Sequence, residues 1–145
     1  MHKLFAFIVM AALLAGCQTA DDALDTHTAP AAISGLAASA VAGDMASRLA
    51  EQIGRGGTTT IKMKKDSSEF AATLEAALKG WGYTVIVDQK VAKDVTPLEL
   101  AWSIGSMDGQ ILAQLSTPSI AISRAYLVTP AGATPASPLS IMQRS

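Results

Sequence analysis

Apolar residues recur at helical spacing through residues 35–53, and this period predicts the first long element of the chain. Ser34 directly precedes the pattern and is a residue type favoured at the N-cap of a helix. The glycine-rich run at residues 54–57 follows the pattern, and glycine is preferred just past a helix end. We therefore expect a helix over residues 35–53. Its apolar positions are Leu36, Ala40, Met45, Leu49 and Ile53.

The next stretch changes from a period of two to a helical period and back. In residues 58–64, TTTIKMK, the apolar Ile61 and Met63 alternate with lysines, as in a strand with one buried face. A helix is expected over residues 67–79, and the run YTVIVD at 83–88 predicts a second strand. Together these elements form a split β-α-β core.

The expected second helix carries recognisable signals at both ends. Asp66 is the predicted N-cap, and Glu69 stands three residues later as its capping-box partner. Gly80 is expected to supply a left-handed terminus, after which Trp81 packs back on the helix. The apolar positions predicted to face the core are Phe70, Leu74, Ala77 and Leu78.

Three further strands are predicted as an antiparallel meander, with a turn at Asp108-Gly109 and a break at Pro118. They are expected at residues 98–104, 110–115 and 120–128. The fold class is therefore α+β. We expect a small two-layer sandwich, in which a split β-α-β core precedes the meander and the helices cover one sheet face.

The beginning of the chain has the pattern of an export signal. His2 and Lys3 precede an apolar run at residues 4–14 that is too short to span a bilayer, which needs about 20 residues. The segment Leu14, Ala15, Gly16 and Cys17 resembles a bacterial lipobox. This resemblance implies a diacylglycerol on the Cys17 sulfur, cleavage before Cys17 and an acyl chain on the new N-terminus. The alternative is an ordinary secretory peptide with a chance cysteine.

The residue after the cysteine indicates the location of the protein. Gln18, rather than Asp, follows the cysteine, and by resemblance to enterobacterial lipoproteins this favours the inner leaflet of the outer membrane, facing the periplasm.

The chain is expected to have four parts. They are a signal peptide (1–16), the lipidated cysteine with a flexible tether (17–33), an α+β domain (34–129) and a Pro-rich C-terminal tail (130–145). The tail contains three prolines and many small residues, so we expect it to be extended or disordered.

The net charge and the positions of the histidines argue against several classes of function. The formal net charge of −1 gives no support for a nucleic-acid-binding surface. His2 leaves with the signal and His27 lies in the tether, so the expected domain has no histidine for a nucleophile–base pair or a metal site. We therefore expect no enzyme, no metal, no cofactor and no small-molecule substrate. The acyl groups on Cys17 are the only expected non-protein groups.

One group of residues is a candidate interaction surface. Lys62, Lys64 and Lys65 form the main basic cluster, which can contact phosphates of lipid or an acidic partner, or can simply be the solvated face of a strand. Trp81 and Trp102 are candidates for stacking on glycans, although packing in the core is an alternative role. This surface supports an alternative function, an envelope-binding lipoprotein that recognises peptidoglycan or lipid.

The order of parts resembles a known family. The lipobox, the tether, the first helix and the segment SRLAEQIGRGGTTTIKMKKDSSEFAATLEAALKGWGYTVI at residues 47–86 resemble the TrbH conjugal transfer lipoproteins, and so does SRAYLVTPAGATPASPLSIMQ at 123–143. The resemblance implies a structural part in the Trb type IV secretion (mating-pair formation) apparatus, with other Trb channel subunits as partners. Cys17 is the only residue to which this resemblance assigns a defined role.

Overall fold

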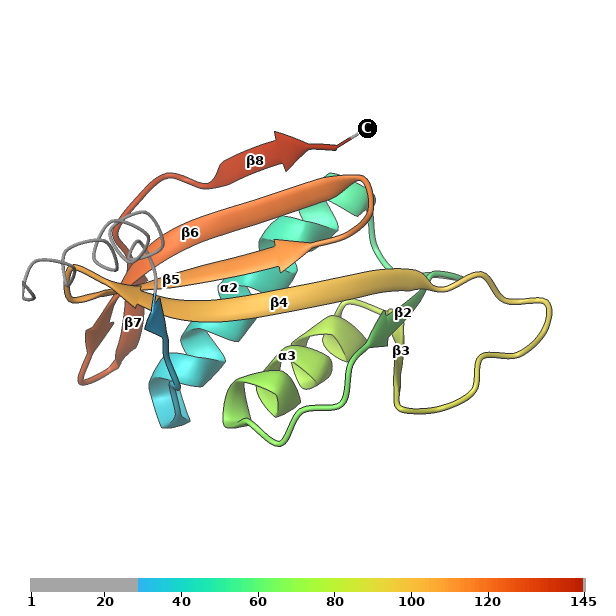
Figure 1. Ribbon diagram of the computed structural model, residues 1–145, viewed down its shortest axis with the longest axis horizontal. Coiled ribbons are helices and arrows are strands. Elements are labelled where there is room, and N and C mark those ends of the chain that lie inside the picture. Colours follow the sequence, from blue (N-terminus) through green and yellow to red (C-terminus); the bar gives the residue numbers. More distant parts are fainter. Residues whose placement is uncertain (1–28, 145) are drawn as a thin grey trace, which may run out of the picture.

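A single sheet with two helices on one of its faces makes up the structure (Figure 1). The computed structural model describes residues 29–144. Its sheet has the strand order β3-β2-β4-β5-β6-β7, with β1 added on β4 and β8 added on β6. The elements are β1 (Ala29–Pro30), α2 (Gly35–Ile53), β2 (Thr60–Met63), α3 (Glu69–Gly80), β3 (Thr84–Val87), β4 (Leu98–Met107), β5 (Gln110–Ser116), β6 (Ile120–Thr129), β7 (Gly132–Pro135) and β8 (Ser140–Gln143).

The α+β sandwich with an antiparallel meander is confirmed, because β4, β5 and β6 pair antiparallel in sequence order. The β-α-β unit differs from the expectation in one respect. Strands β2 and β3 are parallel and direct neighbours, and β4 pairs with the other edge of β2. The unit is therefore a plain β-α-β rather than a split one.

Helix α2 has the predicted bounds, and its predicted buried positions are confirmed in part, since Met45 and Leu49 are fully buried. Leu36 is 63% exposed, because its side chain points away from the sheet on which the neighbouring Ala37 and Ala38 are buried. The buried positions are mostly small residues, which let the helix approach the sheet closely. They are Ala37, Ala38, Val41, Ala42, Met45, Ala46, Leu49 and Ala50.

The predicted N-cap of α2, Ser34, is confirmed, although its side chain makes no capping hydrogen bond, whereas the predicted N-cap of α3 is wrong. Ser68, not Asp66, is the N-cap of α3, and its Oγ accepts a hydrogen bond from the backbone N–H of Ala71 at 3.1 Å. Asp66 instead accepts the N–H of Ser68, and this bond lowers the pKa of its carboxyl group. Glu69 caps the other helix, since its Oε1 accepts the N–H of Gly35 at 2.7 Å. Glu69 thus links the first turns of the two helices.

The turn after α3 also differs from the expectation. Helix α3 runs through Gly80, and Gly82 is the residue with the left-handed backbone, at a φ of 94°. This turn packs directly against the glycine run after α2. A Cβ on Gly56 would lie 2.1 Å from the carbonyl carbon of Gly82, so only glycine fits there. The glycine run therefore ends α2 and also lets two backbone segments touch.

The expected C-terminal tail is not disordered. Strand β7 pairs with residues 126–129 of β6, and β8 pairs with residues 120–123 along the same edge. The prolines that suggested disorder stand at the end of β7 or in the connections, where no ladder N–H is lost. The N-terminal boundary shifts as well, because β1 pairs with β4 and Ile33 is buried. The folded unit thus exceeds 34–129 at both ends.

Candidate functional site

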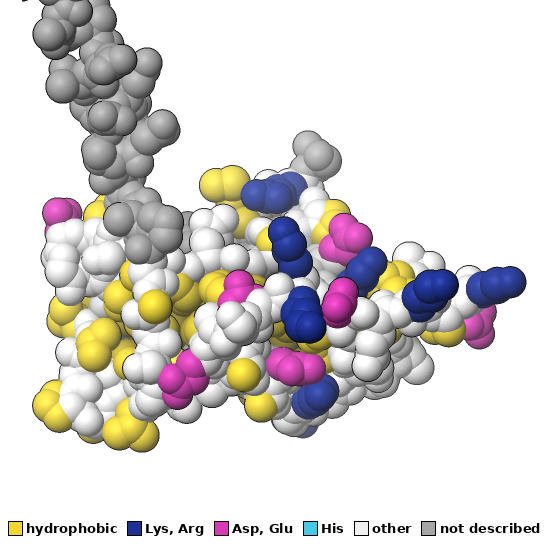
Figure 2. All heavy atoms as spheres, turned by 60° about the horizontal axis from the view of Figure 1, so that its bottom comes forward, with side chains coloured by type: hydrophobic (Ala, Val, Ile, Leu, Met, Phe, Trp, Pro, Cys, Tyr) yellow, Lys and Arg dark blue, Asp and Glu magenta, His cyan; other side chains and the backbone are white. Residues whose placement is uncertain are grey.

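The basic side chains are unevenly distributed on the surface. In Figure 2 the Lys and Arg side chains gather on one half of the molecule, while Asp and Glu side chains are scattered over both halves. The predicted modification site, Cys17 with Leu14, Ala15 and Gly16, lies outside the described residues, as does His27. The candidate sites within residues 29–144 are therefore surface features formed by charged and apolar side chains.

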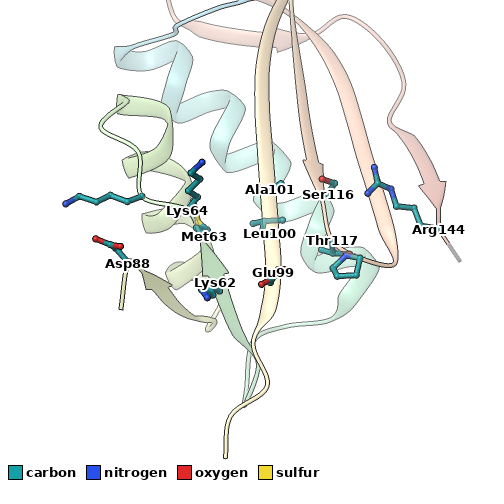
Figure 3. Close-up of a pocket in the computed structure, with 12 residues that line it drawn as sticks. Lys62, Met63, Lys64, Asp88, Glu99, Leu100, Ala101, Ser116, Thr117 and Arg144 are labelled. Atoms are coloured by element: carbon teal, nitrogen blue, oxygen red, sulfur yellow. The ribbon is translucent and has the colours of Figure 1, made fainter. Parts of the chain in front are cut away.

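The three predicted lysines line one pocket with a volume of about 480 Å³, which we call the basic pocket (Figure 3). Strands β2 and β4 form one wall, and the turn between β5 and β6 forms the opposite wall. The charged side chains around it are Lys62, Lys64, Lys65, Arg144, Asp88 and Glu99.

The period of two in β2 explains where these lysines lie. Ile61 and Met63 are buried under the helices, so Lys62 projects from the helix-free face of the sheet. Lys64 follows the last residue of the strand. Lys62 is in register with Glu99 on the neighbouring strand β4. Lys65 follows directly after Lys64 and extends the basic cluster beyond the strand.

Arg144 was not predicted as part of this cluster, since the tail was expected to be disordered. Its backbone N–H donates to the carbonyl oxygen of Ser119 at 2.8 Å, which fixes the end of the chain beside the pocket. The buried Thr117 holds the adjoining turn, because its Oγ1 accepts the N–H groups of Ser119 and Ile120. The β8 pairing thus completes the pocket from a segment 79 positions beyond Lys65.

The basic side chains of the pocket are not neutralised within the described part of the chain. The acid–base pairs within 4.0 Å in residues 29–144 use Arg48, Lys79 and Arg124, and none involves the four pocket cations. Four cations face two carboxylates around an open cavity. This arrangement attracts an anionic group and offers it several hydrogen-bond donors.

Of the two tryptophans, only Trp102 shares a surface with the predicted lysines. The ring of Trp102 packs against Phe70 of α3, with 5.0 Å between centroids and an interplanar angle of 58°. Trp102 also borders a second hollow, with Lys64 and Lys65. Trp81 lines neither hollow and lies under the guanidinium of Arg55, 5.0 Å from the ring centroid. Packing thus occupies one face of each ring.

A polar cluster that sequence reasoning missed joins α2 to the sheet. Oδ2 of Asp44 accepts hydrogen bonds from the hydroxyl of Tyr126 at 2.6 Å and from Nη1 of Arg124 at 3.0 Å. Nε of Arg124 donates to the carbonyl oxygen of Ser137, between β7 and β8. Burial, and next the bond to Asp44, raise the pKa of Tyr126, so this phenol stays protonated and donates. The cluster fastens α2, β6 and the C-terminal segment together.

The described residues contain neither a metal-binding group nor a membrane-spanning helix. Within residues 29–144, no three His, Cys, Asp or Glu side chains are grouped so that they could hold a metal ion. In the same range, neither helix combines the length and apolar character needed to cross a membrane.

Comparison with known proteins gives a consistent result. Residues 19–145 match the family described as "Conjugal transfer protein TrbH". A protein of Sinorhizobium fredii named "Probable conjugal transfer protein TrbH" is 64% identical to this chain over the full length of both. No solved structure shows a significant match. The chain therefore belongs to the TrbH family of conjugal transfer proteins.

Proposed function

We propose that the protein is a lipid-anchored structural component of the conjugative type IV secretion apparatus, with other Trb channel subunits as its partners. Its full-length identity of 64% to a probable conjugal transfer protein is the observation that carries this proposal. In this role the domain is a non-catalytic assembly module on the periplasmic side of the outer membrane.

The lipobox resemblance supports the anchor. Each buried methylene contributes about 0.8 kcal/mol to membrane binding, so several acyl chains on Cys17 hold a protein far more firmly than one reversible chain does. A tethered domain meets its partners at a raised effective concentration, so weak contacts with channel subunits suffice for assembly. The exposed edges of the sheet are one physical route to such contacts, because a partner strand can pair with them.

The decisive experiment compares the wild type with Cys17→Ser and Gln18→Asp in conjugating cells. Mass spectrometry of the N-terminal peptide from membranes should show an acylated peptide that begins at Cys17 in the wild type. The Cys17→Ser protein should lack acylation, and mating frequency and the amount of assembled channel should both fall. Gln18→Asp is the matched control for sorting, since it should keep the acyl groups but move the protein to the inner membrane.

Two results would contradict the proposal. An unmodified, soluble N-terminal peptide in the wild type would remove the anchor. Normal mating and normal channel assembly with Cys17→Ser would show that the anchor is not needed for transfer.

A second candidate function rests on the basic pocket. Four basic side chains without an ion-pair partner in the described residues surround a cavity large enough for a small anionic group. Peptidoglycan carries carboxylates on its stem peptides, so this pocket supports recognition of the cell wall. Sedimentation of the protein with purified sacculi tests this candidate.

A further inference from the structure

Large apolar side chains are exposed mainly at one end of the sheet. Among the described residues seven such side chains are exposed, and four of them, Leu36, Met107, Leu127 and Val128, lie at this end. We call these four residues the apolar end. Leu36 and Val128 are the most exposed of them, at 63% and 57%. Single exposed apolar residues are ordinary on protein surfaces, but a group of them is not. The charged side chains next to this group are Glu69, whose Oε1 accepts the N–H of Gly35, and Asp108.

The sheet register brings these residues together. Met107 pairs with Gln110 in the β4–β5 hairpin, and the pairing of Ile111 with Tyr126 places Gln110 next to Leu127. Met107 and Leu127 therefore project from the same, helix-free face. Val128 lies one residue further along β6.

The remaining residue of the apolar end comes from α2. Gly132 of β7 lies against the first turn of this helix, since a Cβ on it would be 3.2 Å from the carbonyl oxygen of Leu36. Val128 is in register with Ala133, the residue after Gly132. The four side chains thus surround one end of the domain on both faces of the sheet.

Charge is nearly absent from the segments that build this end. Residues 29–37, 105–112 and 126–136 contain one charged residue, Asp108. The loop between β3 and β4 extends from the opposite end of the molecule (Figure 1), and the basic side chains gather on that half (Figure 2). The domain is therefore polarised along its length.

The described chain begins at the apolar end. Ala29 of β1 pairs with Ser106, which is adjacent to Met107. Eleven residues, 18–28, separate Cys17 from Ala29. A segment of this length reaches at most about 40 Å when fully extended, so an anchor at Cys17 lies within about 40 Å of this end.

We infer that the apolar end docks on the lipid surface that holds the acyl chains of Cys17. The inference rests on the anchor in the proposed function and adds the orientation of the domain. Apolar side chains insert at the boundary between headgroups and acyl chains, and the short connection keeps their local concentration high. The basic pocket then faces away from the membrane, toward the cell wall and the channel.

The test places a reporter at each end of the full-length, acylated protein. Because Cys17 is the only cysteine and its thiol is blocked by the lipid, Val128→Cys or Ala92→Cys supplies a single reactive thiol for an environment-sensitive fluorophore. Each labelled protein is bound to vesicles of phosphatidylethanolamine and phosphatidylglycerol. Quenching is measured with aqueous iodide and with a brominated lipid.

The expected result is a clear difference between the two labels. The label at position 128 should be quenched by the brominated lipid and protected about threefold or more from iodide, as for a group at the lipid boundary. The label at position 92 should remain fully accessible to iodide. Adding Leu36→Ser and Leu127→Ser to the Val128→Cys protein should abolish the protection without unfolding, since both side chains are exposed.

Three other results would overturn the inference. Equal iodide access at both positions in vesicle-bound protein would show an anchored domain that does not dock. Protection that disappears when the protein-to-lipid ratio is lowered would show contact between copies of the chain instead. Protein that does not cosediment with vesicles and carries no acyl group would refute the anchor, and the proposed function would fail with it.

Discussion

The hydroxyl of Tyr126 on β6 donates a 2.6 Å hydrogen bond to Oδ2 of Asp44 on α2, although 82 positions separate them in the chain. The same oxygen accepts from Arg124, and both donors are largely buried. We expect Asp44→Ala to lower the free energy of unfolding by about 2–3 kcal/mol, because two buried donors then lose their acceptor. Urea denaturation followed by circular dichroism measures this loss.

Glu51→Ala is the control for the Asp44 prediction. Glu51 pairs with Arg48 on an exposed surface of the same helix, so its removal should change the stability by less than about 0.5 kcal/mol. Equal losses for the two variants would contradict the view that the buried cluster fastens α2 to the sheet.

The raised pKa of Tyr126 predicts a dependence of stability on alkaline pH. Burial raises this pKa above the ordinary value of 10.0, so the unfolded phenol ionises at lower pH than the folded one. Because the pKa of Tyr126 is higher in the folded state than in the unfolded state, its contribution to the free energy of unfolding is complete below about pH 10 and is lost as the pH rises further. We expect the stability of the wild type to fall more steeply above pH 10 than that of Tyr126→Phe. Parallel slopes in pH-dependent urea unfolding would refute this assignment.

The contact between Gly56 and Gly82 predicts opposite effects for two glycine substitutions. Gly56→Ala places a Cβ 2.1 Å from a backbone carbon, so the two turns must separate, and we expect a loss of about 3 kcal/mol or more. Gly43 lies inside α2 with no atom within 4 Å of its Cβ position. Gly43→Ala should therefore stabilise the protein by about 0.5–1 kcal/mol. Thermal unfolding of both variants distinguishes the two cases.

Charge reversal tests the basic pocket as a cell-wall site. Lys64→Glu with Lys65→Glu should reduce cosedimentation with sacculi about tenfold, and binding of the wild type should weaken as salt is added. Lys90→Glu with Lys93→Glu changes the net charge equally, but neither residue lines the pocket. This control should bind like the wild type. An equal effect of the two pairs would show that only overall charge matters.

The local pattern predicted most of the helices and strands. The bounds of α2 are as predicted, and the three meander strands begin where predicted but extend one to three residues further. Each of these elements is long enough to show its period. Strands β1, β7 and β8 were missed, since they have two to four residues and are ordered by pairing with β4 and β6 rather than by their own composition. A segment that contains prolines can pair at the edge of a sheet or be disordered, so its composition alone does not distinguish the two.

The surface was less predictable than the fold. Lys62, Lys64 and Lys65 are adjacent in sequence, so their grouping could be seen, whereas Arg144 reaches the pocket only through the β8 pairing. The partners of Asp44 depend on how α2 lies across β6, and no local signal encodes that crossing. The position of Arg144 and the partners of Asp44 both depend on contacts between residues far apart in the sequence, so the local sequence does not predict them.

The short β1 pairing has a mechanical consequence. Only two residues of β1 pair with β4, and one further bond joins the N–H of Ala31 to the carbonyl of Ile104. Ile33 is buried in the core and holds the segment that leads into α2. Tension applied at the start of β1 therefore acts first on these few bonds, and releasing residues 29–32 lengthens the connection by about 13 Å. The first strand is thus a short extensible link that precedes a firm attachment at Ile33.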